Sequence, residues 1–228
     1  MKKQSVGGRR FVLKAGLAAA VLVLAQRGRN ALAQGAYPQS AEVLRRAREA
    51  EVTTHRRYLA FAKQATADGY PGIAYLFTAF AMAELIHGQN FERVLTGLAG
   101  EVAPLLQRTM AVGSTKENLI TAATDELASV NTFYPGILKD LAPEGLQDAI
   151  RFATYAWNTE KLHLGILESI QRWTPTHFEA VAKKIEDETA QYFVCWICGA
   201  TMVELPKEHC PVCEFPASNI RRIEPPSR

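Results

Sequence analysis

Six residues of this chain have the types and the spacing of a dinuclear metal site. The pattern Glu-x-x-His occurs twice, and a lone glutamate precedes each copy by 33 or 34 residues. The six residues are Glu51, Glu84 and His87 in the first half, and Glu126, Glu160 and His163 in the second. A single Glu-x-x-His is usually a solvated helix surface, but two copies with matched upstream partners favour a shared site.

The four glutamates fall on faces that are otherwise apolar. Glu84, for example, shares a helical face with Phe77, Phe80 and Phe91. Four buried carboxylates would cost tens of kcal/mol if they were ionised and unpaired, so a cation is expected among them. A four-helix bundle would bring four carboxylates and two imidazoles together, which is the general arrangement of ferritin-like dinuclear carboxylate proteins. This ligand set suits iron or manganese.

The four cysteines predict a second metal site. They form two C-x-x-C pairs, Cys195 with Cys198 and Cys210 with Cys213, separated by 11 residues. This spacing indicates a tetrathiolate site. Two structural disulfides are the alternative, and four thiolates accept either iron or zinc. A redox-active dinuclear centre on the same chain favours iron, because zinc cannot relay electrons.

The N-terminal segment predicts export. Residues 1–33 contain seven Lys or Arg and no acidic residue, with Arg9-Arg10 before an apolar run and Ala31-Leu32-Ala33 at the end. This is typical of a twin-arginine signal peptide cleaved after Ala33. The apolar run of 11 residues is too short for a membrane span, which needs about 20. We therefore expect a periplasmic protein, which would be membrane-tethered if the signal were retained.

Removal of the signal changes the charge of the protein. It leaves 19 basic against 23 acidic residues, a formal charge of −4 instead of +3, and nothing then indicates a nucleic-acid partner. We predict a ferritin-like four-helix bundle over residues 34–190 and a small tetrathiolate domain over residues 191–228.

The helical pattern predicts where the bundle helices begin and end. The first helix should run from about Ser40 to Ala67, and the second should end near Gly97 or Gly100. The segment 100–114 is long enough to cross the bundle, and Ser114 with Glu117 predicts a capping box. Pro135 should kink or break the third helix. The fourth helix opens at residues 142–145, and a shorter helix at about 176–189 links it to the tail.

Other polar residues lie close to the expected ligands along the chain. Tyr58 and Tyr134 lie about two turns beyond Glu51 and Glu126, where they could hydrogen-bond the ligands or simply pack in the core. His55 could support a ligand, although an exposed or otherwise bonded histidine is the more common case.

With these motifs in order, the mature chain resembles the rubrerythrin family. The resemblance rests on Glu51 through Tyr58, Asp68-Gly69-Tyr70, Ile73 through Phe77, Glu84-x-x-His87, Glu117-Asn118-Leu119, Tyr134-Pro135, Glu160-x-x-His163 and the rubredoxin-like tail. It implies a di-iron bundle followed by one iron on four thiolates. It also implies reduction of hydrogen peroxide to water with electrons from a separate donor, often across a head-to-tail homodimer.

One position departs from the resemblance. The family usually has another glutamate three residues after the one matched by Glu126, and Ser129 stands there. That glutamate is understood to exchange with the histidine matched by His87 when the irons change oxidation state. A serine is too short to reach the metal, although it could bond a water molecule or Glu126. We therefore expect His87 to stay bound in both states, the iron to move little, and the preference for peroxide over oxygen to be weaker than usual.

These observations favour an exported di-iron peroxide reductase with three irons per chain. The alternative is an iron-handling protein whose centre oxidises Fe(II) with oxygen, and a weaker one is a redox sensor. The tetrathiolate tail argues against pure storage, which needs no electron relay.

Overall fold

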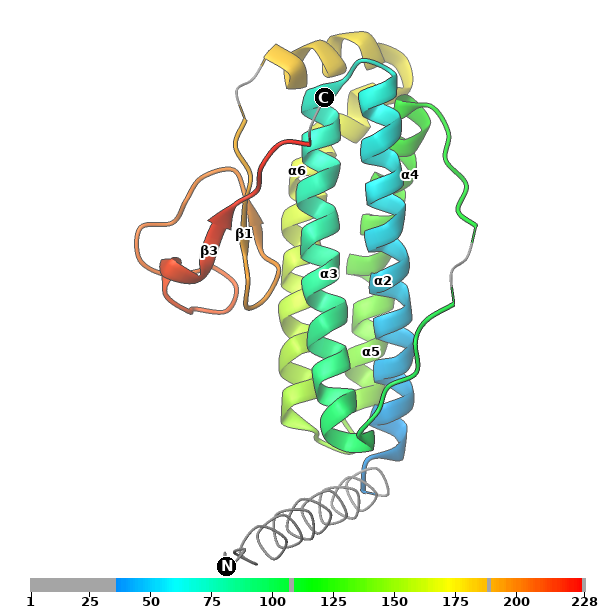
Figure 1. Cartoon of the computed structure of the whole chain (residues 1–228), viewed down its shortest axis with the longest axis vertical. Coiled ribbons are helices and arrows are strands. Elements are labelled where there is room, and N and C mark those ends of the chain that lie inside the picture. Colours follow the sequence, from blue (N-terminus) through cyan, green and yellow to red (C-terminus); the bar gives the residue numbers. More distant parts are fainter. Residues whose placement is uncertain (1–35, 107–108, 188–189, 227–228) are drawn as a thin grey trace, which may run out of the picture.

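The computed structural model describes residues 36–106, 109–187 and 190–226 (Figure 1). The predicted export signal lies outside these residues. Within them the protein is mainly helical, as predicted, with a small sheet at the C-terminal end. None of the helices in the described ranges is long and apolar enough to cross a membrane.

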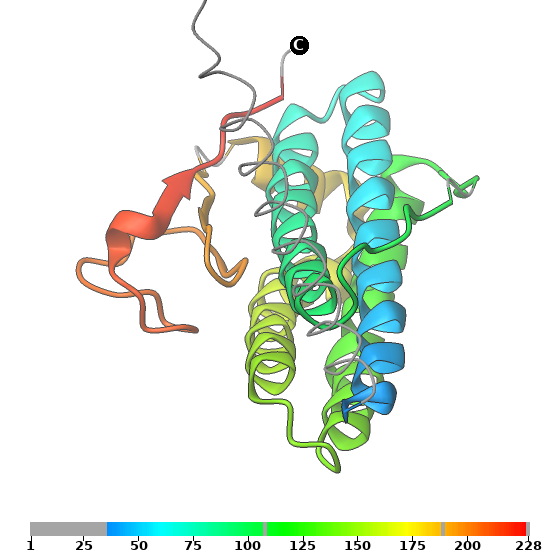
Figure 2. The same cartoon turned by 60° about the horizontal axis from the view of Figure 1, so that its bottom comes forward.

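The helices form a four-membered bundle with a long crossover. Helix α2 (Pro38–Ala67) and helix α3 (Pro71–Ala99) form an antiparallel hairpin, and residues 100–106 and 109–114 then run back along the outside of the bundle (Figures 1 and 2). Helices α4 (Thr115–Ala128) and α5 (Tyr134–Leu141) descend together, and α6 (Gln147–Asp187) returns. The crossover predicted between the second and third helices is confirmed.

Local sequence signals explain most helix ends. Gly69, just after α2, has a φ of +87°, a conformation that favours glycine, and Pro71 starts α3. Helix α4 begins with the predicted capping box, in which Ser114 and Glu117 bond each other's backbone. Residues 142–145 form a turn with Gly145 at φ +62°, so α6 begins slightly later than predicted, at Gln147.

The third bundle helix is interrupted before Pro135 by a π-helical turn, η1 (Ser129–Phe133). The Tyr134 N–H bonds the Ser129 carbonyl, five residues back. In this register the Val130 carbonyl would need the N–H of residue 135, which proline lacks. The Trp157 indole N–H of α6 bonds that carbonyl instead, at 2.8 Å. The break predicted at Pro135 is therefore a widened turn completed by a neighbouring helix.

The predicted linking helix is present. Helix α6 consists of two helical pieces that meet at a kink at His177, whose φ of −133° and ψ of 38° are not helical, and the second piece ends at Asp187. Pro175 lies two residues before the kink in the sequence, and proline is a common cause of helix kinks.

A layer of polar residues divides the apolar core of the bundle into two clusters. One cluster contains Tyr58, Phe61 and Phe77, and the other contains Leu44, Phe91 and Tyr134. On every bundle helix the predicted glutamate ligand lies between residues of the two clusters. The core therefore packs above and below the layer that holds the six candidate ligands.

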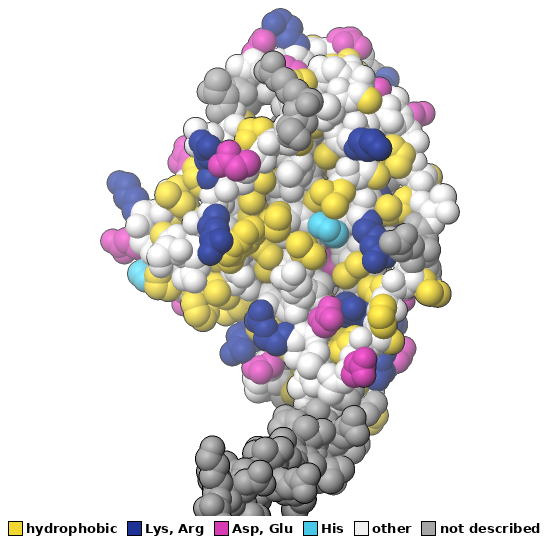
Figure 3. All heavy atoms as spheres, in the orientation of Figure 1, with side chains coloured by type: hydrophobic (Ala, Val, Ile, Leu, Met, Phe, Trp, Pro, Cys, Tyr) yellow, Lys and Arg dark blue, Asp and Glu magenta, His cyan; other side chains and the backbone are white. Residues whose placement is uncertain are grey.

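The C-terminal residues form a three-stranded antiparallel sheet in the order β2-β1-β3. The strands are β1 (Phe193–Cys195), β2 (Thr201–Met202) and β3 (Ile220–Arg222), and a short 3-10 turn, η2 (Ala217–Asn219), precedes β3. We call residues 193–223 the knuckle. It lies beside the bundle (Figure 1), and Tyr192, Val194 and Ile223 belong to one of the bundle's core clusters. Figure 3 shows apolar side chains gathered in the middle of this face, with both signs of charge scattered around them.

Candidate metal centres

The six residues of the repeated motif meet in the middle of the bundle. Each is at most 4% exposed: Glu51 on α2, Glu84 and His87 on α3, Glu126 on α4, and Glu160 and His163 on α6. Because Glu and His three residues apart project from one helix face, α3 and α6 each supply a carboxylate and an imidazole. The bundle thus carries two Glu-x-x-His helices and two helices with one glutamate each.

The ligand atoms form two overlapping groups. One is Glu51, Glu84, His87 and Glu160, and the other is Glu84, Glu126, Glu160 and His163. Within each group the atoms lie within 4.8 Å of one another. Glu84 and Glu160 belong to both groups, so two cations here would share them, and each cation would have one glutamate and one histidine of its own.

Distances to the two imidazoles show the same division. One Glu84 oxygen lies 3.0 Å from His87 Nδ1, and the other lies 3.4 Å from His163 Nδ1. In the same way, one Glu160 oxygen lies 3.4 Å from His87 Nδ1, and the other lies 3.4 Å from His163 Nδ1. Both imidazoles therefore turn Nδ1 toward the cluster and Nε2 away from it.

Two buried tyrosines hold the unshared carboxylates. Tyr58 donates to Glu126 Oε1 at 2.6 Å, and Tyr134 donates to Glu51 Oε1. Burial and the adjacent carboxylates raise the pKa of both phenols, so they stay protonated donors. The structure thus places both tyrosines where the sequence allowed a supporting role.

The remaining candidates lie apart from the ligand atoms. The His55 Nδ1 donates to the Ala81 carbonyl at 2.6 Å, so its bond is to backbone. Ser129 is half-buried at the start of η1, and no hydrogen bond from its hydroxyl is found among the described residues.

The electrostatics of the cluster fit cations at its centre. Burial and repulsion from Glu160 raise the pKa of Glu126 to about 8. Burial favours neutral Glu84, but the His163 and His87 imidazoles beside it lower its pKa to about 2. Burial opposes charge on the imidazoles, yet the carboxylates raise the pKa of both. Without metal, the buried negative charge is therefore balanced by protons, which bound cations would displace.

Unpartnered atoms point to the same conclusion. Five buried side-chain atoms of the described residues have no hydrogen-bond partner. Two are His87 Nε2 and Ser40 Oγ, and the other three, Glu84 Oε1, Glu126 Oε2 and His163 Nδ1, face one another in the cluster. Buried polar atoms are normally paired, so these atoms fit the role of metal ligands. Carboxylates with two imidazoles match iron in both charge and donor type.

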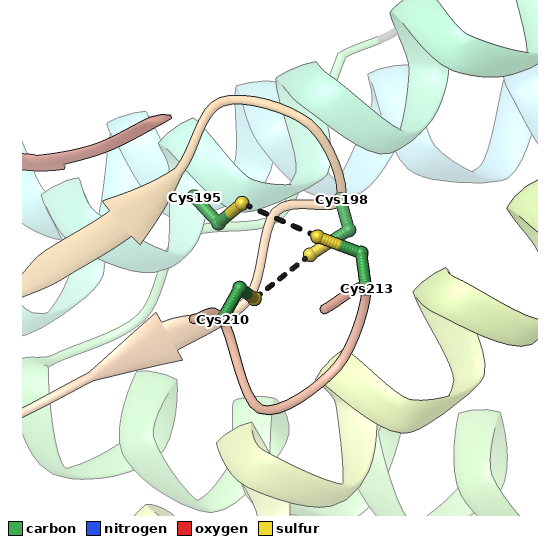
Figure 4. A group of neighbouring side chains, drawn as sticks. All are labelled: Cys195, Cys198, Cys210 and Cys213. Atoms are coloured by element: carbon green, nitrogen blue, oxygen red, sulfur yellow. Dashed lines mark hydrogen bonds between the residues drawn. The ribbon is translucent and has the colours of Figure 1, made fainter. Parts of the chain in front are cut away.

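The four cysteines converge in the knuckle (Figure 4). Cys195 Sγ lies 3.7 Å from Cys213 Sγ, and Cys198 Sγ lies 3.6 Å from Cys210 Sγ. These separations far exceed the roughly 2.05 Å of a disulfide. They match the edge of about 3.8 Å in a tetrahedron with metal–sulfur bonds of about 2.3 Å. The Cys198 thiol donates to Cys195 and lowers the pKa of Cys195 to about 7.

The two halves of the thiolate site have similar backbones. In each C-x-x-C turn the residue after the second cysteine donates its N–H to the carbonyl of the first, at 2.8 Å for Gly199 and 3.0 Å for Glu214. Both residues have positive φ, +83° and +62°. Glycine is required only at the first, where an added Cβ would lie 2.6 Å from His87 Nε2.

The knuckle contacts the dinuclear cluster directly. Besides the packing of Gly199 on His87, Thr201 Oγ1 lies 3.0 Å from His163 Nε2. Thr159, next to Glu160, donates to the Cys198 carbonyl at 3.3 Å. Sequence reasoning missed these contacts, because only Gly199, as a glycine after a C-x-x-C pair, carried any signal.

A ferritin-like bundle with this carboxylate–histidine cluster, joined to a four-cysteine knuckle, defines a di-iron protein with a rubredoxin-like tail. The rubrerythrin family profile matches residues 42–171. The chain is 27% identical to rubrerythrin-2 of Clostridium acetobutylicum over 76% of this chain and 91% of that protein. It is 32% identical to nigerythrin of Nitratidesulfovibrio vulgaris, over 77% and 82%.

Solved structures of nigerythrin have a similar fold. The structure of fully reduced, all-ferrous nigerythrin superposes with a TM-score of 0.70 at 26% identity, covering 81% of this chain and 86% of that one. Mixed-valent nigerythrin gives a TM-score of 0.68. The chain belongs to the rubrerythrin family, whose members carry a di-iron site and a rubredoxin-like iron site and act on peroxide or oxygen with an electron donor.

Proposed function

We propose that this protein is an exported peroxide reductase that receives electrons through its rubredoxin-like iron. Two electrons and two protons convert one hydrogen peroxide into two water molecules. The observation that carries the proposal is the packing of the Cys198–Gly199 turn on His87, which leaves no room for a side chain between the thiolate site and the dinuclear cluster. A short connection of this kind suits electron transfer between two metal centres.

The chain's own residues prepare the cluster for this reaction. When bound, the two irons would supply the electrons that cleave the O–O bond of the peroxide. The Tyr58 and Tyr134 hydroxyls orient Glu126 and Glu51. Phe80 stacks on the His163 ring at 4.1 Å and limits its rotation. Because the cluster is buried between two apolar clusters, bulk water is kept from the carboxylates.

Stopped-flow oxidation of the reduced holoprotein tests the choice of oxidant. Hydrogen peroxide should oxidise the dinuclear site faster than oxygen does at the same concentration. A Glu84→Ala variant, which loses a shared carboxylate, is the control and should not react. Faster oxidation by oxygen, together with oxidation of added Fe(II), would establish the ferroxidase alternative instead.

A second experiment tests the relay. Zinc in place of iron in the thiolate site keeps the knuckle folded on the bundle but cannot relay electrons. The prereduced zinc-substituted protein should still react once with peroxide, while steady-state turnover with an external donor should stop. Unchanged turnover would show that electrons reach the dinuclear site by another route.

The proposed location and assembly need separate tests. Arg9→Lys combined with Arg10→Lys should keep the full-length chain out of the periplasm, whereas the unaltered chain should be recovered there without residues 1–33. We also propose a homodimer, by analogy with the family. Sedimentation of the mature holoprotein at several concentrations measures its oligomeric state. Export of a metal-loaded protein suits the twin-arginine route, which carries folded proteins.

A further inference from the structure

The two histidines of the dinuclear cluster are held in different ways on their outer side. His163 Nε2 lies 3.0 Å from the Thr201 hydroxyl, and both residues are at most 1% exposed. His87 Nε2 is buried without a hydrogen-bond partner in the described chain and packs on Gly199. The repeat makes the two histidines equivalent in sequence, so the difference comes from the knuckle.

The hydrogen bonds of Thr201 determine which His163 nitrogen carries the proton. The Thr201 hydroxyl donates its one hydrogen to the Gly199 carbonyl at 3.2 Å. Its oxygen can then only accept from His163, so in the neutral ring, the form that binds a cation, the proton lies on Nε2. Nδ1 is left with a free lone pair, and it is the nitrogen that faces Glu84, Glu126 and Glu160.

Thr201 owes its position to the fold of the knuckle. It lies in β2, opposite Val194 of β1. The Cys195 N–H bonds the neighbouring Ala200 carbonyl at 3.0 Å. The residue that bonds His163 is therefore fixed by the same backbone that presents the thiolates.

We propose that Thr201 is a positioning residue that sets the tautomer of His163 and makes the Glu126–His163 end of the dinuclear site depend on a folded knuckle. The hydroxyl holds the ring in the form that can bind a cation through Nδ1, and no described residue gives His87 Nε2 the same support. The proposal concerns iron retention, which is measured without an oxidant, so it stands or falls independently of peroxide reduction.

Chelator competition on the full-length holoprotein tests this. Thr201→Val keeps the shape and removes the hydroxyl, and it should release iron from the dinuclear site about 10- to 100-fold faster, the usual effect of losing an outer partner of a metal-bound histidine. Thr201→Ser keeps the hydroxyl and should release iron at close to the wild-type rate. The visible absorption of the thiolate iron reports in each sample that the knuckle is still folded.

Thr159→Val is the matched control, because it removes another knuckle–bundle hydrogen bond, to the Cys198 carbonyl, without touching an imidazole. It should release iron at nearly the wild-type rate. Equal rates for Thr201→Val and Thr159→Val would overturn the proposal, and so would a serine variant with an intact knuckle that behaves like valine.

A spectroscopic measurement covers the case in which Thr201→Val does not fold. In zinc-substituted wild-type protein labelled with ¹⁵N-histidine, the His163 signal should show a proton on Nε2 that exchanges slowly with water. The serine variant should give the same signal. A proton on Nδ1 in the wild type would refute the assignment of the tautomer.

Discussion

Glu84 and Glu160 differ from the other two glutamates because each presents one oxygen to either imidazole. Glu51 and Glu126 each have one oxygen bonded to a tyrosine and lie beside a single imidazole. Loss of a shared carboxylate therefore removes a ligand from both halves of the site, whereas loss of an unshared one affects one half.

Replacing Glu84 or Glu160 by Ala should therefore abolish binding of both irons. Glu126→Ala should preferentially weaken the half that contains His163. Iron analysis of each purified variant measures the difference, and the thiolate iron should persist in all of them because the two sites share no ligand. Loss of the thiolate iron in the Glu84 or Glu160 variants would show that the knuckle does not fold independently of the cluster.

Tyr58→Phe should destabilise the metal-free protein by about 1–3 kcal/mol, because it leaves a buried Glu126 oxygen without its donor. Urea unfolding at neutral pH measures the change. Tyr70→Phe is the control, because the one described partner of the Tyr70 hydroxyl is the exposed Glu179, at a long distance of 3.5 Å. Equal stability of the two variants would mean that the Tyr58 bond contributes little.

At the scale of the helices, three N-termini are closed by carboxylates from other elements. Glu144 bonds the Gln39 and Ser40 N–H groups at the start of α2. Glu186 of α6 bonds those of Gly72 and Ile73 at the start of α3. Asp68 bonds Thr115 at the start of α4. Each carboxylate satisfies unpaired N–H groups and interacts favourably with the helix dipole.

Asp68 gives the bundle a pH-dependent link. Hydrogen bonds from the Thr115 side chain and backbone lower its pKa below the usual 3.8. A lowered carboxylate pKa contributes stability above the unfolded value, and this stability is lost as pH falls through the folded value. Asp68→Asn keeps an acceptor but removes the charge, so it should cost on the order of 0.3–1 kcal/mol at pH 7, as for an anion at a helix N-terminus. It should cost nothing at a pH where Asp68 is protonated in both the folded and the unfolded protein.

Urea unfolding of the metal-free wild type and of Asp68→Asn, from pH 7 down to below about pH 3, measures this difference. Asp187→Asn is the control, because within the described residues the Asp187 carboxylate pairs only with Lys183, in an exposed ion pair. A difference between wild type and Asp68→Asn that stays constant over the whole range would contradict the assigned role.

The π-helical turn supports a second test at this scale. Trp157→Phe removes the N–H that bonds the Val130 carbonyl and should cost about 1–2 kcal/mol. Pro135→Ala supplies a backbone N–H that can bond the same carbonyl, so the tryptophan change should cost less in that background. A double-mutant cycle measures the coupling. Additive effects would show that the indole does not substitute for the missing backbone donor.

At the scale of the whole molecule, the sequence predicted the bundle because its signals are local. The glutamates on apolar faces and the capping box at Ser114 each act within a few residues. Pro135 indicated a break, but its form depends on Trp157, 22 residues away in sequence. The docking of the knuckle could not be predicted, because it depends on contacts such as Thr201 with His163 between distant segments.

The docking makes the two positive-φ residues of the knuckle unequal. Gly199→Ala should loosen the knuckle and cost more than about 1–2 kcal/mol, because it adds a clash with His87 to an unfavourable φ. Glu214→Gly should instead be neutral or stabilising by up to about 1 kcal/mol, since glycine adopts this φ without strain. Thermal unfolding of the two holoproteins measures both. A stable Gly199→Ala variant would show that the knuckle does not press on His87.

The position of the knuckle also bears on the order in which the chain is made. A ribosome completes all six bundle ligands, ending with His163, before it reaches Cys195 and the rest of the knuckle. The face of the bundle that Gly199 and Thr201 cover therefore stays uncovered until the knuckle has been made. An iron ion that bound the six ligands in that interval would need no movement of the finished protein, and the knuckle would then close over it.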